Sequence, residues 1–174
     1  MPVSYANLVT LCRLLLFFAF AGALISGQHA ATLIFFLIAW ALDGIDGYLA
    51  RYFKQASVFG SYFDKVVDRV LLIGAVLLLI ATRLVTPWAV LLLTKDIVAL
   101  PALVKRARSP HNTIDVGWTG KFMTLVQGAS IVWLLLELPH ATALISLVAV
   151  LGALVGGNYL LKTYQVTPKL STGV

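Results

Sequence analysis

Cysteine and charged residues are scarce in this chain of 174 residues. It contains one cysteine, Cys12, and 11% of its residues are charged, whereas a soluble domain carries about 25% charged residues. A single cysteine excludes a disulfide framework and a metal site built on cysteines. The low charge and the 60% share of hydrophobic residues exclude a disordered chain, a coiled coil and an ordinary soluble enzyme.

The hydrophobic residues gather in six runs, each close to the roughly 20 residues that a helix needs to cross a bilayer. The loops between the runs are too short to hold a second domain. The sequence therefore predicts an all-α integral membrane protein with a single six-helix domain, residues 1–164, and a polar tail, residues 165–174. The six predicted transmembrane helices are residues 8–26, 32–52, 59–82, 87–104, 119–137 and 141–161.

Lysine and arginine concentrate in alternate loops, while the opposite loops hold only Arg83. Because basic residues mark cytoplasmic loops, both termini are predicted to be cytoplasmic. The protein is then a multi-pass protein of the cell membrane (inner or plasma), or of an organellar membrane in a eukaryotic host. The formal net charge is +6, and we expect anionic membrane lipids, rather than nucleic acid, beside the basic loops.

Four of the seven acidic residues lie within one 26-residue window, at the end of the second run and the start of the third. Carboxylates inside a span are costly, so four of them need compensating positive charge and a reason to be kept. On a helix, Asp43 and Asp46 lie about 60° apart, and Asp64 and Asp68 are one turn apart. A short loop joins the two runs, so the two pairs are expected to face each other near the cytoplasmic surface.

Oxygen-only ligands of this kind suit Mg²⁺, Mn²⁺ or Ca²⁺. A pair of such ions can hold a phosphoryl group and stabilise both its entering and leaving oxygens. Arg51 is placed to pair with the phosphates. The carboxylates could instead form structural ion pairs with Arg51, Lys65 and Arg69. Small residues near these aspartates leave room for a bulky ligand, or simply allow close helix packing: Gly44, Gly47, Ala50 and Gly60.

This segment resembles the motif of the CDP-alcohol phosphatidyltransferase family, D-x2-D-G-x2-A-R-x8-G-x3-D-x3-D. The resemblance implies a metal-dependent enzyme that moves the phosphatidyl group of CDP-diacylglycerol to an alcohol and releases CMP. It also implies two divalent cations, Mg²⁺ or Mn²⁺, an active site open to the cytoplasm, and a homodimer. Every fixed position and every gap of the motif matches here, at Asp43, Asp46, Gly47, Ala50, Arg51, Gly60, Asp64 and Asp68.

The resemblance also implies a role for each residue of the motif. Three aspartates would hold the metals, and Asp68 would lie near the second ion and act as the base that takes the proton from the acceptor hydroxyl. The metal set would be Asp43, Asp46, Asp64 and Asp68. The CDP-binding set would be Asp43, Asp46, Gly47, Ala50, Arg51, Gly60 and Asp64.

Two shorter segments resemble phosphatidylglycerophosphate synthases and the related cardiolipin synthases. Asn7, Thr10 and Arg13 match N-x2-T-x2-R, and the segment 120–124 matches G-K-x2-T. Lys95-Asp96 stands where these relatives often have arginine followed by an acid. These matches favour glycerol 3-phosphate as the acceptor. The predicted acceptor-binding residues are Lys121, Lys105, Arg106, Arg108, Thr10 and Arg13.

Other interpretations stay open at this point. Positive-inside topology alone would explain the basic cluster, and phosphatidylglycerol, an inositol phosphate or serine could be the acceptor. A cation transporter could use the same carboxylates as an ion path, although transport sites tend to lie near the midplane. A non-catalytic membrane scaffold is a third possibility. Gly152 and Gly156 form a small-xxx-small pair that could pack the last helix within the chain or against a partner.

Overall fold

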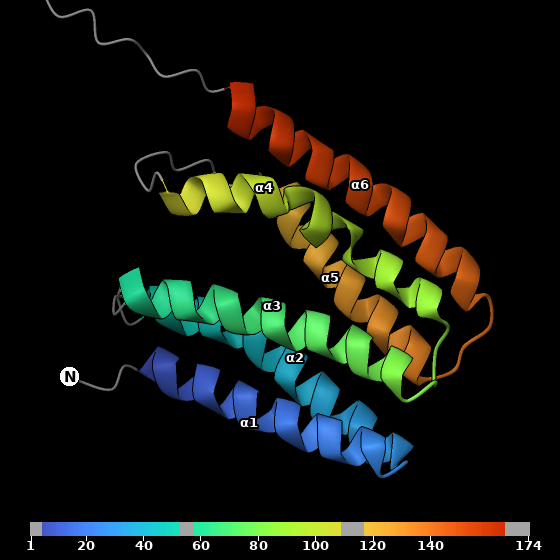
Figure 1. The fold of residues 1–174 in the computed structure, drawn as a ribbon. Helices are drawn as coiled ribbons and strands as arrows, with labels where there is room; N and C mark the ends of the chain where they lie inside the picture. Colours follow the sequence, from blue (N-terminus) through green and yellow to red (C-terminus); the bar gives the residue numbers. More distant parts are fainter. Residues whose placement is uncertain (1–4, 53–57, 109–116, 166–174) are drawn as a thin grey trace, which may run out of the picture. The chain divides into compact units, whose positions relative to one another are not determined.

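A computed structural model describes residues 5–52, 58–108 and 117–165, with side chains over residues 9–42, 67–101 and 118–163. Within these ranges the chain forms six α-helices and one 3-10 helix, and it contains no strand (Figure 1). The prediction of an all-α fold is confirmed. The elements are α1 (Tyr5–Ile25), α2 (His29–Tyr52), α3 (Val58–Ala81), η1 (Pro87–Leu93), α4 (Thr94–Arg108), α5 (Gly117–Leu135) and α6 (Ala141–Gln165).

The fourth predicted helix, residues 87–104, is divided in the structure into η1 and α4, with the junction at Thr94. The Thr94 hydroxyl donates a hydrogen bond to the Leu91 carbonyl at 2.5 Å, and the side-chain amide of Gln127 donates to the Leu92 carbonyl at 2.7 Å. Carbonyls at a helix end lack intrahelical partners. Side chains supply those partners here, and one of them comes from a distant part of the sequence.

One helical segment in the described part of the chain, Ala141–Thr163, is both long and apolar enough to cross a membrane, judged by length and composition. The apolar segments Val9–Ile25 and His29–Leu42 are shorter. The six-span topology therefore remains a prediction.

The helices divide into two compact units. The first comprises Met1–Val90 and Gly128–Ala141, and the second comprises Leu91–Gln127 and Thr142–Val174. Helix α5 contributes to both units, because the boundary falls in its middle.

In the first unit, α1 packs against both α2 and α3 (Figure 1). The Phe17 ring lies over Gly74 of α3, where an added Cβ would be 2.5 Å from the ring atom Cζ. Phe17 also stacks on Phe20 with ring centroids 5.9 Å apart, and Phe20 meets Phe36 of α2 at 5.8 Å. Aromatic pairs at such separations add about 0.5–1.5 kcal/mol each beyond their buried area. These contacts connect the three helices, and Phe20 is buried among them.

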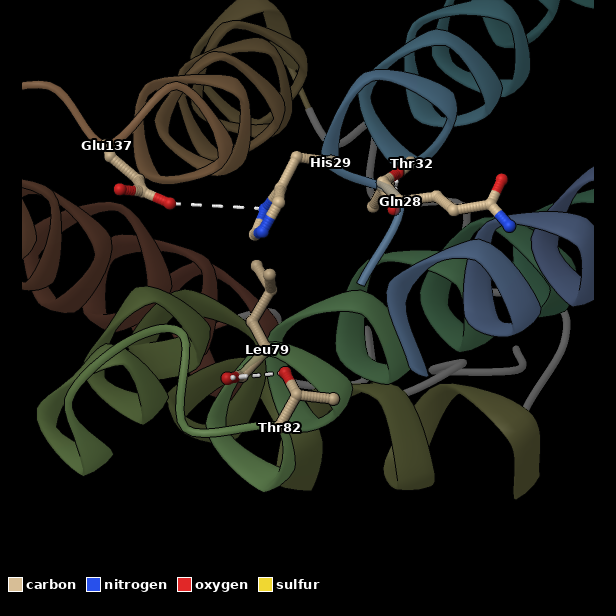
Figure 2. Close-up of polar contacts among 6 residues, drawn as sticks. All are labelled: Gln28, His29, Thr32, Leu79, Thr82 and Glu137. Atoms are coloured by element: carbon tan, nitrogen blue, oxygen red, sulfur yellow. Dashed lines mark hydrogen bonds and ion pairs between the residues drawn. The ribbon is translucent and has the colours of Figure 1, made fainter. Parts of the chain in front are cut away.

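Polar contacts in the same unit lie near the start of α2 and the end of α3 (Figure 2). The hydroxyl groups of Thr32 and Thr82 donate to backbone carbonyls of the preceding turn, the latter to Leu79 at 3.2 Å. His29 Nδ1 lies 4.0 Å from Glu137 Oε1, and both side chains are more than half exposed. An exposed pair of this kind contributes little to stability. These contacts belong to the helix ends opposite those that carry the aspartate motif.

In the second unit, α6 approaches the backbone of α4 through two glycines. A Cβ added at Gly152 would lie 3.0 Å from the Lys95 backbone nitrogen. A Cβ at Gly156 would lie 2.9 Å from Val98 Cβ and 3.1 Å from the Lys95 carbonyl oxygen. Both glycines are buried. Of the two roles open to this pair, the structure shows packing within the chain.

Candidate active site

The aspartate motif occupies two helix segments that are consecutive in the chain. Asp43 and Asp46 lie in the last three turns of α2, and Asp64 and Asp68 lie in the first three turns of α3. Because both segments are helical, spacings of three and four residues place each pair on one helix face. The predicted helical setting of the motif is confirmed.

The side chains of most motif residues lie outside the described residues. Their mutual approach, and the facing of the two acidic stripes, therefore remain predictions. The residues concerned are Asp43, Asp46, Gly47, Ala50, Arg51, Gly60 and Asp64.

Asp68 is the motif residue whose side chain the structure describes, and it contacts α1. Arg13 Nη2 donates a hydrogen bond to Asp68 Oδ1, and the two groups form an ion pair. The Arg13 side chain is 3% exposed, whereas that of Asp68 is 30% exposed. A buried guanidinium needs an opposite charge, and a charge-assisted hydrogen bond is stronger than one between neutral groups. The contact ties the fourth aspartate of the motif to the first helix.

The sequence placed Thr10 and Arg13 in one short motif and Asp68 in another, and the structure brings the two motifs together. Thr10 is 3% exposed and lies one turn before Arg13 on the same face of α1. The N-x2-T-x2-R segment therefore turns its threonine and arginine into the first unit. The contact itself could not be predicted, because the spacing along one helix does not reveal which neighbour that helix meets.

The donor chemistry of the motif fits divalent cations. Four carboxylates on two helix segments supply only oxygen ligands, as Mg²⁺ and Mn²⁺ prefer. Among the residues with described side chains, no group of three or more acidic, histidine or cysteine residues is present. Three of the four aspartates are not among those residues.

A second polar cluster is built in the second unit, between α4 and α5. Lys95 Nζ donates to Thr124 Oγ1 at 2.7 Å and reaches the Gly120 carbonyl oxygen at 3.5 Å. Gln127 Nε2 donates to Asp96 Oδ2 at 3.0 Å. Lys95, Asp96 and Gln127 are all at most 8% exposed. The structure thus joins the substituted Lys95-Asp96 pair to the G-K-x2-T segment.

Gln127 was missed by sequence reasoning, although it left a signal. It is an amide in an otherwise apolar stretch of α5, three residues after Thr124 and on the same face. Its two partners, Asp96 Oδ2 and the Leu92 carbonyl, are both acceptors, so the amide nitrogen must point to them. Its Oε1 is buried and has no hydrogen-bond partner among the described residues.

Of the remaining predicted acceptor residues, the structure describes the side chain of Lys121 alone. Lys121 is exposed, whereas Gly120 beside it is buried. Positive charge near a helix C-terminus is favoured by the helix dipole, so the end of α4 suits basic residues whether or not they bind a ligand. The basic residues at that end, whose side chains lie outside the described residues, are Lys105, Arg106 and Arg108.

Comparison with known proteins agrees with the motif. The family model of the CDP-alcohol phosphatidyltransferases matches residues 3–155. A probable phosphatidylglycerophosphate synthase of Mycobacterium tuberculosis is 31% identical, and the match covers 93% of this chain and 82% of that protein.

Two further relatives have a more specific name, CDP-diacylglycerol--glycerol-3-phosphate 3-phosphatidyltransferase. The protein of Escherichia coli is 29% identical, and the match covers 78% of each chain. The protein of Haemophilus influenzae is 35% identical over 59% of this chain and 57% of its own length, so the match spans less than two thirds of that relative.

Proposed function

Because the chain belongs to the CDP-alcohol phosphatidyltransferase family, we propose that it transfers the phosphatidyl group of CDP-diacylglycerol to glycerol 3-phosphate. CMP is the second product, and the new lipid is phosphatidylglycerophosphate. The observation that carries the proposal is the complete eight-position motif on α2 and α3. The names of the bacterial relatives support glycerol 3-phosphate as the acceptor.

The reaction needs positive charge beside the diphosphate and a base beside the acceptor. Two divalent cations, when bound, neutralise the diphosphate and stabilise CMP as a leaving group. The residues proposed to hold them are Asp43, Asp46 and Asp64, with Asp68 near the second ion. Gly47, Ala50, Arg51 and Gly60 are proposed to line the CDP site, with the Arg51 guanidinium paired to phosphate oxygens.

Asp68 is proposed to act as the general base. Its carboxylate takes the proton of the acceptor hydroxyl as that oxygen forms a bond to the phosphatidyl phosphorus. The bond from this phosphorus to the bridging oxygen breaks, and the electron pair leaves with CMP. The Asp68 side chain suits this role because it is 30% exposed, so its carboxylate remains accessible to a hydroxyl.

The acceptor carries a phosphate, so its site needs basic residues. We propose Thr10 and the four basic residues Lys105, Arg106, Arg108 and Lys121 as candidates. Arg13 belongs to the same predicted set, and in the structure it contacts Asp68. We further propose that the protein lies in a cell membrane, because the lipid donor must reach the site from the bilayer. The distribution of basic residues supports a cytoplasmic location for both termini and the site. The resemblance to the family supports a homodimer.

The test is CMP release by purified protein in lipid vesicles that contain CDP-diacylglycerol. We expect release with glycerol 3-phosphate and Mg²⁺ or Mn²⁺, and none after chelation. Asp68→Asn should abolish turnover, whereas Glu137→Gln, an exposed acid at the opposite helix ends, should not.

The acceptor is checked with phosphatidylglycerol, inositol phosphate and serine in parallel. Activity with one of these and none with glycerol 3-phosphate would refute the acceptor and keep the class of reaction. Cation flux without any CMP release would refute the enzyme and favour a transporter.

A further inference from the structure

Arg13 is placed to act on the reaction through Asp68. It lies on α1, outside the eight-position motif, yet its Nη2 donates to Oδ1 of the proposed base. We infer that Arg13 is a positioning residue, which fixes the Asp68 carboxylate so that its second oxygen serves the acceptor hydroxyl. This inference rests on the proposed function of Asp68.

Burial distinguishes this contact from a surface ion pair. The Arg13 side chain is 3% exposed, so breaking the contact would take the Asp68 counter-charge away from a guanidinium that water does not reach, which is costly. Asp68 is ten times more exposed, at 30%. The arginine is therefore the fixed partner and the carboxylate is the group that remains open to a ligand.

The backbone of α1 is held in place beside this contact. One turn after Arg13, the Phe17 ring lies over Gly74 of α3, where even a Cβ would be 2.5 Å from the ring. The ion pair and this aromatic contact join the same two helices. Arg13 is thus carried by a packed helix rather than by a loop, as the orientation of a reacting group requires.

The contact also gives the two carboxylate oxygens of Asp68 different roles. Oδ1 accepts the hydrogen bond from Arg13, so Oδ2 is the oxygen assigned to the acceptor hydroxyl. A carboxylate held at one oxygen by a guanidinium keeps one rotamer and presents the other oxygen in one direction. Loss of Arg13 would let the side chain turn, and a misplacement of about 1 Å can cost about 100-fold in rate.

The experiment compares Arg13→Gln and Arg13→Lys with wild-type protein in the CMP-release assay. We expect Arg13→Gln to lower kcat about 100-fold, with the KM for glycerol 3-phosphate changed by less than about threefold. Arg13→Lys keeps the charge, so its kcat should be at least about tenfold higher than that of Arg13→Gln. The matched control is Arg83→Gln, which removes an exposed arginine from the same unit and should leave both constants unchanged.

A second readout needs no turnover. Thermal unfolding of Arg13→Gln, Asp68→Asn and the double variant should be non-additive, because the two side chains interact directly. Additive shifts would overturn the contact.

The kinetic outcomes separate the alternatives. A rise in the KM for glycerol 3-phosphate with kcat intact would overturn positioning and favour direct binding of the acceptor. Unchanged kinetics in Arg13→Gln would also overturn it. If the wild-type protein released no CMP, the proposed function would fall together with this role, while non-additive unfolding would still report the ion pair.

Discussion

The glycine contact between α6 and α4 allows a sharp test with a control on the neighbouring residue. Gly156→Ala adds a methyl group 2.9 Å from Val98 Cβ and 3.1 Å from the Lys95 carbonyl oxygen. The second of these atoms belongs to the backbone and cannot turn away, so α6 must move. Forcing an extra methyl group into a packed interface costs about 1–3 kcal/mol. Gly157→Ala meets no described atom within 4 Å.

Both substitutions bring the same gain in helix propensity, about 1 kcal/mol for alanine over glycine. Gly157→Ala should therefore raise the free energy of unfolding. The free energy of unfolding of Gly156→Ala should be about 1–3 kcal/mol lower than that of Gly157→Ala. Thermal unfolding in detergent micelles, followed by circular dichroism, measures the difference. Equal stability of the two variants would refute the close approach of α6 to α4, and with it the packing of Gly152 and Gly156 within the chain.

Two further predictions concern buried contacts. Gln127→Met removes the donor to Asp96 and to the Leu92 carbonyl and should cost about 1–3 kcal/mol. Gln127→Glu should cost more in thermal unfolding, because it sets a second carboxylate beside Asp96, and a milder effect of glutamate would contradict the network. Gly128→Ala places a Cβ 2.5 Å from Trp40 Nε1, so it should shift the tryptophan fluorescence as well as lower stability by about 1–3 kcal/mol. Unchanged fluorescence would contradict this approach of α5 to α2.

Helix type and the placement of the motif could be predicted from sequence, because both depend on local periodicity. The apolar runs gave the helices to within a few residues, and the spacing from Asp43 to Asp68 gave the two helix segments of the motif. The division of the fourth run could not be predicted. It depends on Gln127, a residue of another helix, which binds the carbonyl of Leu92.

Two buried residues of the site could be picked out from sequence, but their partners could not. Arg13 and Lys95 were singled out as parts of short motifs, and both are buried. Their partners, Asp68 and Thr124, lie 55 and 29 residues further along the chain. A spacing rule within one helix cannot predict such pairs, because they depend on which helices contact each other and at which positions along their axes.

Helix α1 contacts α3 at two points, and this restricts the number of residues between those two points on α1. Arg13 and Phe17 are four residues apart, and each has its own counterpart on α3, Asp68 and Gly74. Inserting one residue between them would turn one point about 100° from the other, so both could not be satisfied. The number of residues from 13 to 17 is therefore as restricted as their identity, because an insertion or deletion there would break one of the two contacts.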